Sequence, residues 1–344
     1  MPISKVAYTL ITFLAAIIIL SYGQNFIMPF ILAMFIWLLI KELKKAMNMI
    51  GFVRRKFPSW LLSIVASVFM FLVLGFVTEL LVYNIKALSH SSATYTTNLD
   101  KMVNMLNDTF NINLRSLLGD YATDLNFASI LATVVNSLTD ILGNAFLIAL
   151  YVLFLLIEES VFSAKLKAIF PESARFDRVD GIIREIENAV TDYIGLKTLV
   201  SLTTGVLSYI VLLILGVESP VFWAFLIFLL NFIPTIGSLI ATLFPAIYAL
   251  LQFGELTPFF LVLSLVGLVQ VIVGNILEPK IMGNALNISS LVAILSLSFW
   301  GWLWGITGMI LSIPITVMIV IVFAQFPGTR PIAILLSGKG KAGT

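Results

Sequence analysis

Long apolar runs separated by short polar segments dominate the chain. In the first half these runs lie at about residues 6–21, 26–40, 60–83 and 138–157. Such runs approach or reach the roughly 18–20 residues that cross a bilayer as a helix. They are continuous and do not alternate apolar with polar residues, so they favour helices over a transmembrane barrel. We therefore predict an all-α polytopic membrane protein.

The apolar pattern of the second half is interrupted. A span at about 196–216 is followed by two apolar legs around NFIPTIG (231–237). Each leg holds about 13–16 residues, or about 20–24 Å of helix, which is short for a hydrocarbon core of about 30 Å. We expect a re-entrant hairpin with its tip at Asn231–Gly237. A simple turn between two spans at the membrane surface is the alternative.

The same order then recurs. A span at about 258–276 precedes two further apolar legs, 288–300 and 309–325, around FWGWLWGITG (299–308). In both places a glycine opens the second leg and a proline follows it, as in GSLIATLFPAI and GITGMILSIPIT. Inverted repeats with interrupted helices are typical of secondary transporters. We predict such a repeat here, with two complete crossings as the alternative for the last pair of legs.

The distribution of basic residues predicts the orientation of the chain in the membrane. The segment KELKKAMNMIGFVRRKFP (41–58) carries six basic residues and one acid, and short loops this basic stay in the cytoplasm. Lys5 and the tail residues Arg330, Lys339 and Lys341 agree. Both termini are therefore expected in the cytoplasm. A cleaved signal peptide is the alternative for the first run, but no clear cleavage site precedes Gln24.

Two polar segments complete the predicted organisation. Apolar positions in 85–106 recur in steps of three and four, which predicts a helix that continues span three outward. Apolar positions in 158–195 recur at helical spacing among charges of both signs, which predicts an amphipathic helix. The expected order is three N-terminal membrane helices (1–84), an extracytoplasmic helical hairpin (85–137), a fourth membrane helix (138–157), a cytoplasmic amphipathic helix (158–195), a transport core (196–326) and a cytoplasmic tail (327–344).

Composition excludes several classes of protein. The chain is 60% hydrophobic and 11% charged, whereas soluble domains carry about 25% charged residues. It has no cysteine, so disulfides and thiolate metal sites are excluded. The net charge of +2 is too small to indicate a nucleic-acid partner. The single histidine, His90, falls in the predicted outer hairpin and is no basis for a metal site.

Sequence motifs for catalysis are absent. The chain contains no GxSxG, HExxH or P-loop. GKGKAG (338–343) formally matches GxGxxG, but it lies at the chain end with no helix after it. We therefore expect no enzyme, no cofactor and no bound metal, and any pumping must use an ion gradient, a partner or the gradient of the substrate.

Polar residues between apolar runs are the candidates for function. Glu278 and Lys280 stand in NILEPKIMG (275–283), and ionisable residues at membrane depth are usually functional. Glu278 either caps a helix that Pro279 ends at the surface, or it forms a polar hinge inside the transport core that faces a proton or ligand. Asn275 and Gln270 nearby favour the polar path.

Lys197 also has two interpretations. It can snorkel to the interface from the start of its span, which we favour, or pair with a carboxylate of the core. The full set of predicted sites is a substrate path of Asn231, Pro234, Thr235, Gly237, Gln270, Asn275, Trp300 and Trp302; coupling or gating residues Glu278, Lys280 and Lys197; and hinges at Pro279, Gly283, Gly301, Gly305 and Gly308.

Four blocks of the C-terminal half resemble a known family. LKTLVSLTTG, LLNFIPTIGSLIATLFP, GNILEPKIMG and LSLSFWGWLWGITGMILSIPIT are similar to the signature blocks of the autoinducer-2 exporter family. The EPKIMG and FWGWLWG blocks are most similar to members that export this quorum-sensing signal. The resemblance implies a bacterial inner-membrane protein of about eight spans. Other members are proposed to be sodium/proton antiporters.

The matching positions carry the family pattern only in part. Many relatives have a proline near the start of the last hairpin, where this chain has Ser290, so the path into that hairpin differs. The matched positions are Pro234–Gly237 for the PTIG block, Glu278, Pro279 and Gly283 for the EPxxxG block, and Trp300, Gly301 and Trp302 for the tryptophan block.

Three functions follow as hypotheses. The first is a secondary transporter that exports a small polar metabolite such as autoinducer-2, with Asn231 and Thr235 binding its hydroxyl groups and Glu278 coupling to protons. The second is a sodium or other cation/proton antiporter that uses Glu278. The third is a membrane scaffold built on the outer hairpin and the cytoplasmic helix. Besides the solute, we expect protons or sodium, membrane lipid and further copies of the chain in a homo-oligomer as partners.

Overall fold

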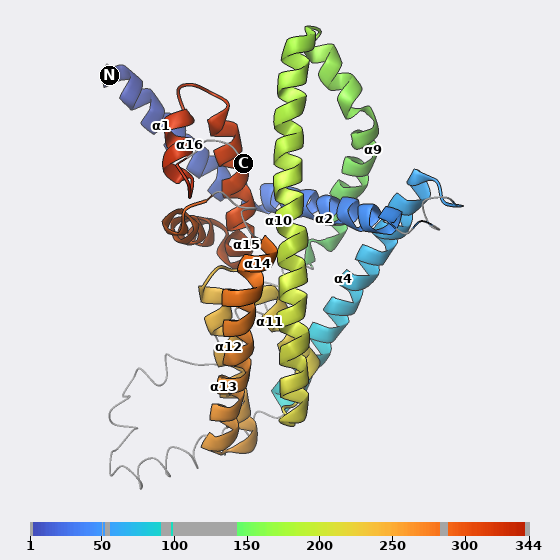
Figure 1. The fold of residues 1–344 in the computed structure, drawn as a ribbon, viewed down its shortest axis with the longest axis vertical. Coiled ribbons are helices and arrows are strands. Elements are labelled where there is room, and N and C mark those ends of the chain that lie inside the picture. The colour runs from blue at the N-terminus through green and yellow to red at the C-terminus, as the bar shows by residue number, and fades with distance from the viewer. Residues whose placement is uncertain are drawn as a thin grey trace. The chain divides into compact units, whose positions relative to one another are not determined.

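The structure is a computed structural model that describes residues 3–49, 51, 56–90, 98, 143–282 and 288–340. These residues are built from helices, with no strand among them (Figure 1). Seven of the described helices are long and apolar enough to cross a membrane, and two shorter apolar helices accompany them. The prediction of an all-α polytopic membrane protein is confirmed. The predicted outer hairpin after His90 lies outside the described residues, apart from Asn98.

The chain forms two compact units. The first unit comprises residues 1–71, 137–194 and 286–344, and the second comprises residues 72–136 and 195–285. Each unit contains one of the two interrupted helix pairs predicted from the sequence. The first unit therefore has its own helix break at Trp304–Gly305, and the second has one at Asn231–Thr235.

The first unit is centred on two packed membrane helices, α2 (Gln24–Met49) and α9 (Ala145–Ile169). Their contact is lined by small and branched side chains, which lets the helices approach closely. The buried cluster contains Ala33, Ile40, Ala66, Ile148 and Val152. The other helices of this unit are α1 (Ile3–Tyr22), α15 (Ser290–Ala324), α16 (Arg330–Leu336), the first part of α4 (Ser59–His90) and the first part of α10 (Ser173–Ile214).

Two polar segments are more helical than we predicted. α2 continues through the basic segment to Met49, because Leu43 and Met47, one turn apart, still pack on the buried cluster. The predicted amphipathic helix and span five are one helix, α10, since only Gly195 stands at their junction. A single glycine inside a helix costs about 1 kcal/mol, too little to end it. α9 likewise extends beyond the predicted span to Ile169, while residues 138–142 of that span lie outside the described residues.

The second unit consists of helices that follow one another closely. α11 (Pro220–Leu230) and α12 (Ile236–Phe253) are separated by the predicted break, and α12 packs beside α13 (Leu256–Ile272) (Figure 1). A π-helical turn, η1 (Val273–Leu277), joins α13 to the short α14 (Glu278–Met282). The interruption near Asn231–Gly237 is confirmed, while its depth in a membrane stays a prediction.

The tip between α11 and α12 is a tight and strained turn. Thr235 has φ 59° and ψ −59°, and the Ile236 N–H donates to the Pro234 carbonyl at 2.6 Å. This is a γ-turn with positive φ, a rare conformation that is unfavourable for a β-branched residue. Just after it, a methyl group on Gly237 would lie 1.8 Å from the Leu230 carbonyl oxygen. In a straight helix seven residues span about 10 Å, so the chain turns back on itself here.

The tip within α15 uses the same device. Trp304 and Gly305 are non-helical, and Gly305 has φ 60°. A methyl group on Gly308 would lie 1.9 Å from the Trp300 carbonyl oxygen, although eight residues of straight helix span about 12 Å. Each unit therefore turns its interrupted helix at a residue with positive φ and seats a glycine against the carbonyl that ends the first leg.

The expectation that Pro279 could end the preceding helix is wrong. Pro279 is the second residue of α14, which follows η1 without a gap. Proline cannot donate to the carbonyl four residues earlier and its ring crowds that carbonyl. A π-helical turn widens the backbone ahead of the proline, so the helix can continue as a π-bulge instead of ending.

The two tip glycines should be intolerant of a side chain. Gly237→Ala and Gly308→Ala are each expected to lower the free energy of unfolding by about 1–3 kcal/mol or more, because their methyl groups overlap backbone oxygen. The measurement is the thermal unfolding midpoint of the purified full-length protein. Gly181→Ala is the matched control, since a methyl group there meets nothing within 4 Å. Equal midpoints for all three variants would contradict the tight-turn geometry.

Candidate functional site

A partly buried ion pair lies in the second unit. The Lys197 Nζ atom of α10 donates to the Glu278 Oε1 atom of α14 at 2.5 Å. The Lys197 side chain is 6% exposed and that of Glu278 is 25% exposed. The pairing interpretation of Lys197 is thus confirmed, and snorkelling is not what the side chain does. The two charged residues that the sequence left unconnected form one interaction.

The backbone around Glu278 explains how it reaches Lys197. Glu278 is the first residue after the π-helical turn, and Lys197 lies two residues past Gly195, where the second unit's part of α10 starts. A π-bulge shifts the side chains after it relative to a regular helix, and such bulges are frequent at functional sites. The sequence signal for it is a proline that directly follows the acid within an otherwise helical pattern.

A polar stripe extends the site along α10. Lys197, Ser201, Thr204 and Ser208 are all buried, and their spacing of four, three and four residues places them on one helix face. Asn231, which ends α11, donates from Nδ2 to Ser201 Oγ at 3.0 Å. Because Ser201 lies one turn from Lys197, the amide contact and the ion pair are about 6 Å apart along the helix axis.

The stripe also has a structural role. A methyl group on Gly205 would lie 3.1 Å from the Ala224 carbonyl oxygen, so α10 and α11 pack with their backbones close together. Small and hydroxylated residues commonly line such contacts between membrane helices. Thr204 satisfies its own hydroxyl by donating to the Val200 carbonyl at 2.9 Å.

The remaining predicted residues of this unit do not all join the site. Gln270 is buried, and its Nε2 atom has no hydrogen-bond partner in the part of the chain that the structure describes. Asn275 and Lys280 are exposed, so Lys280 is separate from the ion pair. At the hairpin tip, Gly237 is buried, Pro234 is half-buried and Thr235 is exposed. Pro279 is also exposed, and Gly283 lies outside the described residues.

The tryptophan block of the first unit divides between two faces. Trp300 and Trp304 are buried at 6% and 4% exposure, whereas Trp302 is 72% exposed. Trp304, which we did not single out, donates from its indole nitrogen to the Leu20 carbonyl at 3.1 Å and so ties the tip to α1. Residues four positions apart lie on the same face of a helix, so the sequence spacing of Trp300 and Trp304 was a signal that could have identified Trp304. Among the predicted hinges of this block, Gly301 and Gly308 are buried and Gly305 is exposed.

A second charged cluster lies in the first unit. Lys41 of α2 forms ion pairs with Glu159 of α9, at 3.3 Å, and with Glu187 of α10. The Trp37 indole nitrogen donates to Glu159 at 2.9 Å, and the Lys41 ammonium lies 4.6 Å from the Trp37 ring centroid. Sequence reasoning missed this cluster because it read Lys41 only as a topogenic charge. It joins three helices of the unit.

No group of three potential metal ligands of the histidine, cysteine, aspartate or glutamate type occurs among the described residues. The chemistry that the described site offers is therefore hydrogen bonding and the making or breaking of ion pairs.

Comparison with known proteins identifies the family of this chain. Residues 8–328 match the family described as "AI-2E family transporter". The chain belongs to the AI-2E transporter family. Its apolar helices and its bacterial relatives make it a multi-pass inner-membrane transport protein that moves a small solute.

Relatives cover nearly the whole chain. A "Putative transport protein" of Haemophilus influenzae is 32% identical over 95% of this chain and 95% of its own length. The "AI-2 transport protein TqsA" of Escherichia coli is 32% identical over 94% of this chain and 92% of its own length. The "Putative transport protein YhhT" of Escherichia coli is 37% identical over 60% of this chain and 58% of its own length.

The ion pair should show strong energetic coupling. Lys197→Met or Glu278→Leu alone strands a buried charge and is expected to cost about 3–5 kcal/mol of stability. The double variant should recover much of that loss, because two apolar side chains can replace a buried pair with little net cost. Thermal unfolding of the four proteins in a double-mutant cycle measures the coupling. Additive losses would mean that the two side chains do not interact.

Proposed function

We propose that this transporter exports a small polar metabolite, with autoinducer-2 as the leading candidate. The observation that supports autoinducer-2 as the substrate is the similarity to the AI-2 transport protein of Escherichia coli across 94% of the chain. The family blocks near Asn231 and Glu278 agree with it. We propose export and not uptake because family members that handle this signal are expected to export it.

The geometry suggests how the second unit contributes. Asn231, Ser201 and Gln270 offer uncharged hydrogen-bonding groups, which suit a hydroxylated solute, and the interrupted backbone between α11 and α12 provides more. Irregular backbone at membrane depth persists only where protein, water or a solute satisfies its polar groups. We infer that this break borders the solute path.

The ion pair is the proposed gate and coupling element. In a low-dielectric surrounding, separating Lys197 from Glu278 leaves two uncompensated charges, so the closed pair is strongly preferred while water is excluded. Entry of water, a proton on Glu278 or a competing cation removes that preference. The pair thereby links opening of the unit to the arrival of a proton or cation.

Topology and assembly belong to the same proposal. The excess of basic residues in 41–56 and in the tail supports a cytoplasmic location for both termini. α1 and α4 expose large apolar side chains, among them Leu14, Ile18, Leu72 and Phe76. In a membrane such faces contact lipid or a second copy of the chain, which supports a homo-oligomer surrounded by lipid.

A sodium or other cation/proton antiporter is the second candidate. It needs a carboxylate that binds a cation and a proton in turn, and Glu278 retains 25% exposure, so a cation can reach it from one side. Lys197 would then act as the internal competitor for the carboxylate. In this case cations, not autoinducer-2, would be the transported species.

Reconstituted transport separates the two candidates. Proteoliposomes containing the wild-type protein should move autoinducer-2, and Glu278→Gln should reduce the rate by at least about tenfold, equivalent to about 1.4 kcal/mol. Lys280→Gln is the matched control, since Lys280 is an exposed neighbour two residues away, and it should keep the wild-type rate. Proton and sodium gradients are varied separately.

The outcomes have distinct meanings. Sodium-dependent proton movement without flux of autoinducer-2, abolished in Glu278→Gln, would establish the antiporter instead. Flux that is equal in Glu278→Gln and Lys280→Gln would remove the ion pair from the mechanism while leaving the transporter assignment in place.

A further inference from the structure

The first unit contains a cavity that none of the predicted sites covers. It has a volume of about 190 Å³ and lies where the start of α2 meets the broken tip of α15. It is smaller than the pockets of about 300–1,000 Å³ that take drug-sized ligands. The cavity therefore suits a small solute.

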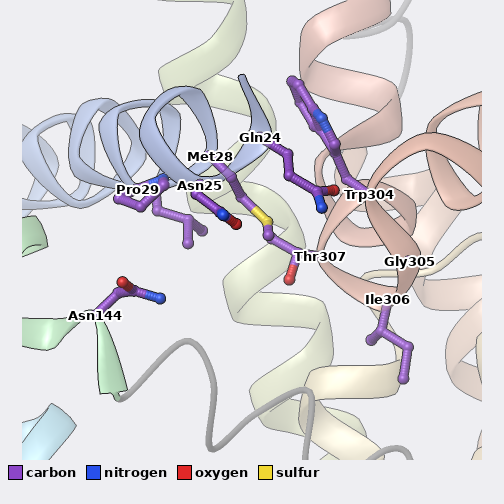
Figure 2. A pocket seen from close by; sticks show the side chains of 10 residues that line it. Gln24, Asn25, Met28, Pro29, Asn144, Trp304, Gly305, Ile306 and Thr307 are labelled. Carbon is purple, nitrogen blue, oxygen red and sulfur yellow. The ribbon is translucent and has the colours of Figure 1, made fainter. Parts of the chain in front are cut away.

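The polar side chains that the described part of the chain contributes to the lining are all uncharged. Gln24, Asn25 and Asn144 contribute carboxamides and Thr307 contributes a hydroxyl group. In Figure 2 the side chains of Gln24, Asn25 and Thr307 gather around one space, with Asn144 on its far side. Carboxamides and hydroxyls both donate and accept hydrogen bonds. Among the residues that the structure describes, no lysine, arginine, histidine, aspartate or glutamate lines the cavity.

The break in α15 shapes one wall. Gly305 has φ 60° and ψ −143°, and a methyl group there would meet nothing within 4 Å, so the backbone stands open to the cavity. Trp304 also lines the space, and its indole is held by the hydrogen bond to Leu20. The leg that begins after Gly305 starts with backbone N–H groups that lack carbonyl partners within that leg. Such groups add donors for an oxygen-rich ligand.

Apolar atoms supply the rest of the surface. Met28, Pro29 and Leu32 from α2 face the same cavity. A few hydrogen-bonding groups set in an otherwise apolar lining is the usual composition of a small-molecule site. An ionic ligand would leave its charge uncompensated here, whereas an uncharged molecule with hydroxyl and carbonyl groups finds both donors and acceptors.

We propose that this cavity binds a small uncharged hydroxylated solute through Gln24, Asn25, Asn144 and Thr307. The proposal rests on the transport function and assigns a second polar contact site for the solute, in a unit other than the one that holds the ion pair. The side chains discriminate by charge: neutral polyols and hydroxycarbonyl compounds are accepted and phosphorylated ones are rejected.

Binding to the purified full-length protein in lipid nanodiscs tests the proposal. The probes are D-ribose, a neutral hydroxycarbonyl compound of suitable size, and ribose 5-phosphate, its anionic counterpart. Calorimetric titration should show saturable binding of ribose and at least about tenfold weaker binding of the phosphate, the discrimination that 1.4 kcal/mol gives. Ribose should also raise the thermal unfolding midpoint.

Variants locate the binding. Asn25→Leu and Thr307→Val, which remove hydrogen-bonding groups at similar side-chain volume, should each weaken ribose binding about three- to tenfold. Gln24→Leu, at an exposed position, gives the same test if the buried Thr307 variant does not fold. Asn48→Leu is the matched control, because it removes an amide of α2 far from the cavity, and it should bind as the wild type does.

Each result has one meaning. No saturable binding of ribose, or binding that all three cavity variants leave unchanged, overturns the proposal and leaves a cavity that holds water only. Phosphate binding as strong as ribose binding overturns the charge selectivity. If proteoliposomes that contain the same purified protein move autoinducer-2, the transport proposal survives either result, so the two failures can be told apart.

Discussion

Hydrocarbon offers no partner to a polar group, and this constraint accounts for most of what is unusual in the chain. An unpaired N–H, C=O or charge in lipid costs several kcal/mol. Lys197 and Glu278 therefore neutralise each other within the second unit, and Asn231 donates to Ser201 one turn away. In the first unit Lys41, which belongs to the segment expected at the cytoplasmic surface, also pairs with Glu159 and Glu187. These three contacts each join polar residues from separate helices.

The same constraint applies to the free backbone groups of the two broken helices. Each unit interrupts one helix at a residue with positive φ and places a glycine against the carbonyl that ends the first leg. One tip lies close to the Asn231 contact and the other lines the uncharged cavity. Free backbone groups thus occur beside side chains that can bind a solute, as expected of secondary transporters with interrupted helices.

The sequence predicted the helical class and both interruptions well, because apolar runs, Pro and Gly are local signals. It predicted element ends less well. α10 continues through Gly195 because packing outweighs the cost of one glycine, and α2 continues through a basic segment because Leu43 and Met47 still have a core to contact. The partners of Lys197 and Lys41 could not be predicted, since the carboxylates they meet are 81 residues away for Lys197 and far along the chain for Lys41. Gln24, Asn25 and Asn144 were missed because amides near helix ends are common and become a site only when the fold gathers them.

The π-helical turn before Glu278 has a mechanical consequence. It holds one residue more per turn than the α-helix around it, and each residue of an α-helix advances the side-chain direction by about 100°. If η1 tightened to a regular α-helical turn, the side chains of α14 would rotate by roughly 100° about the helix axis. The carboxylate would then sweep away from the ammonium without any helix having to tilt or slide. The contact between Glu278 and Lys197 therefore depends on the backbone register between Val273 and Leu277.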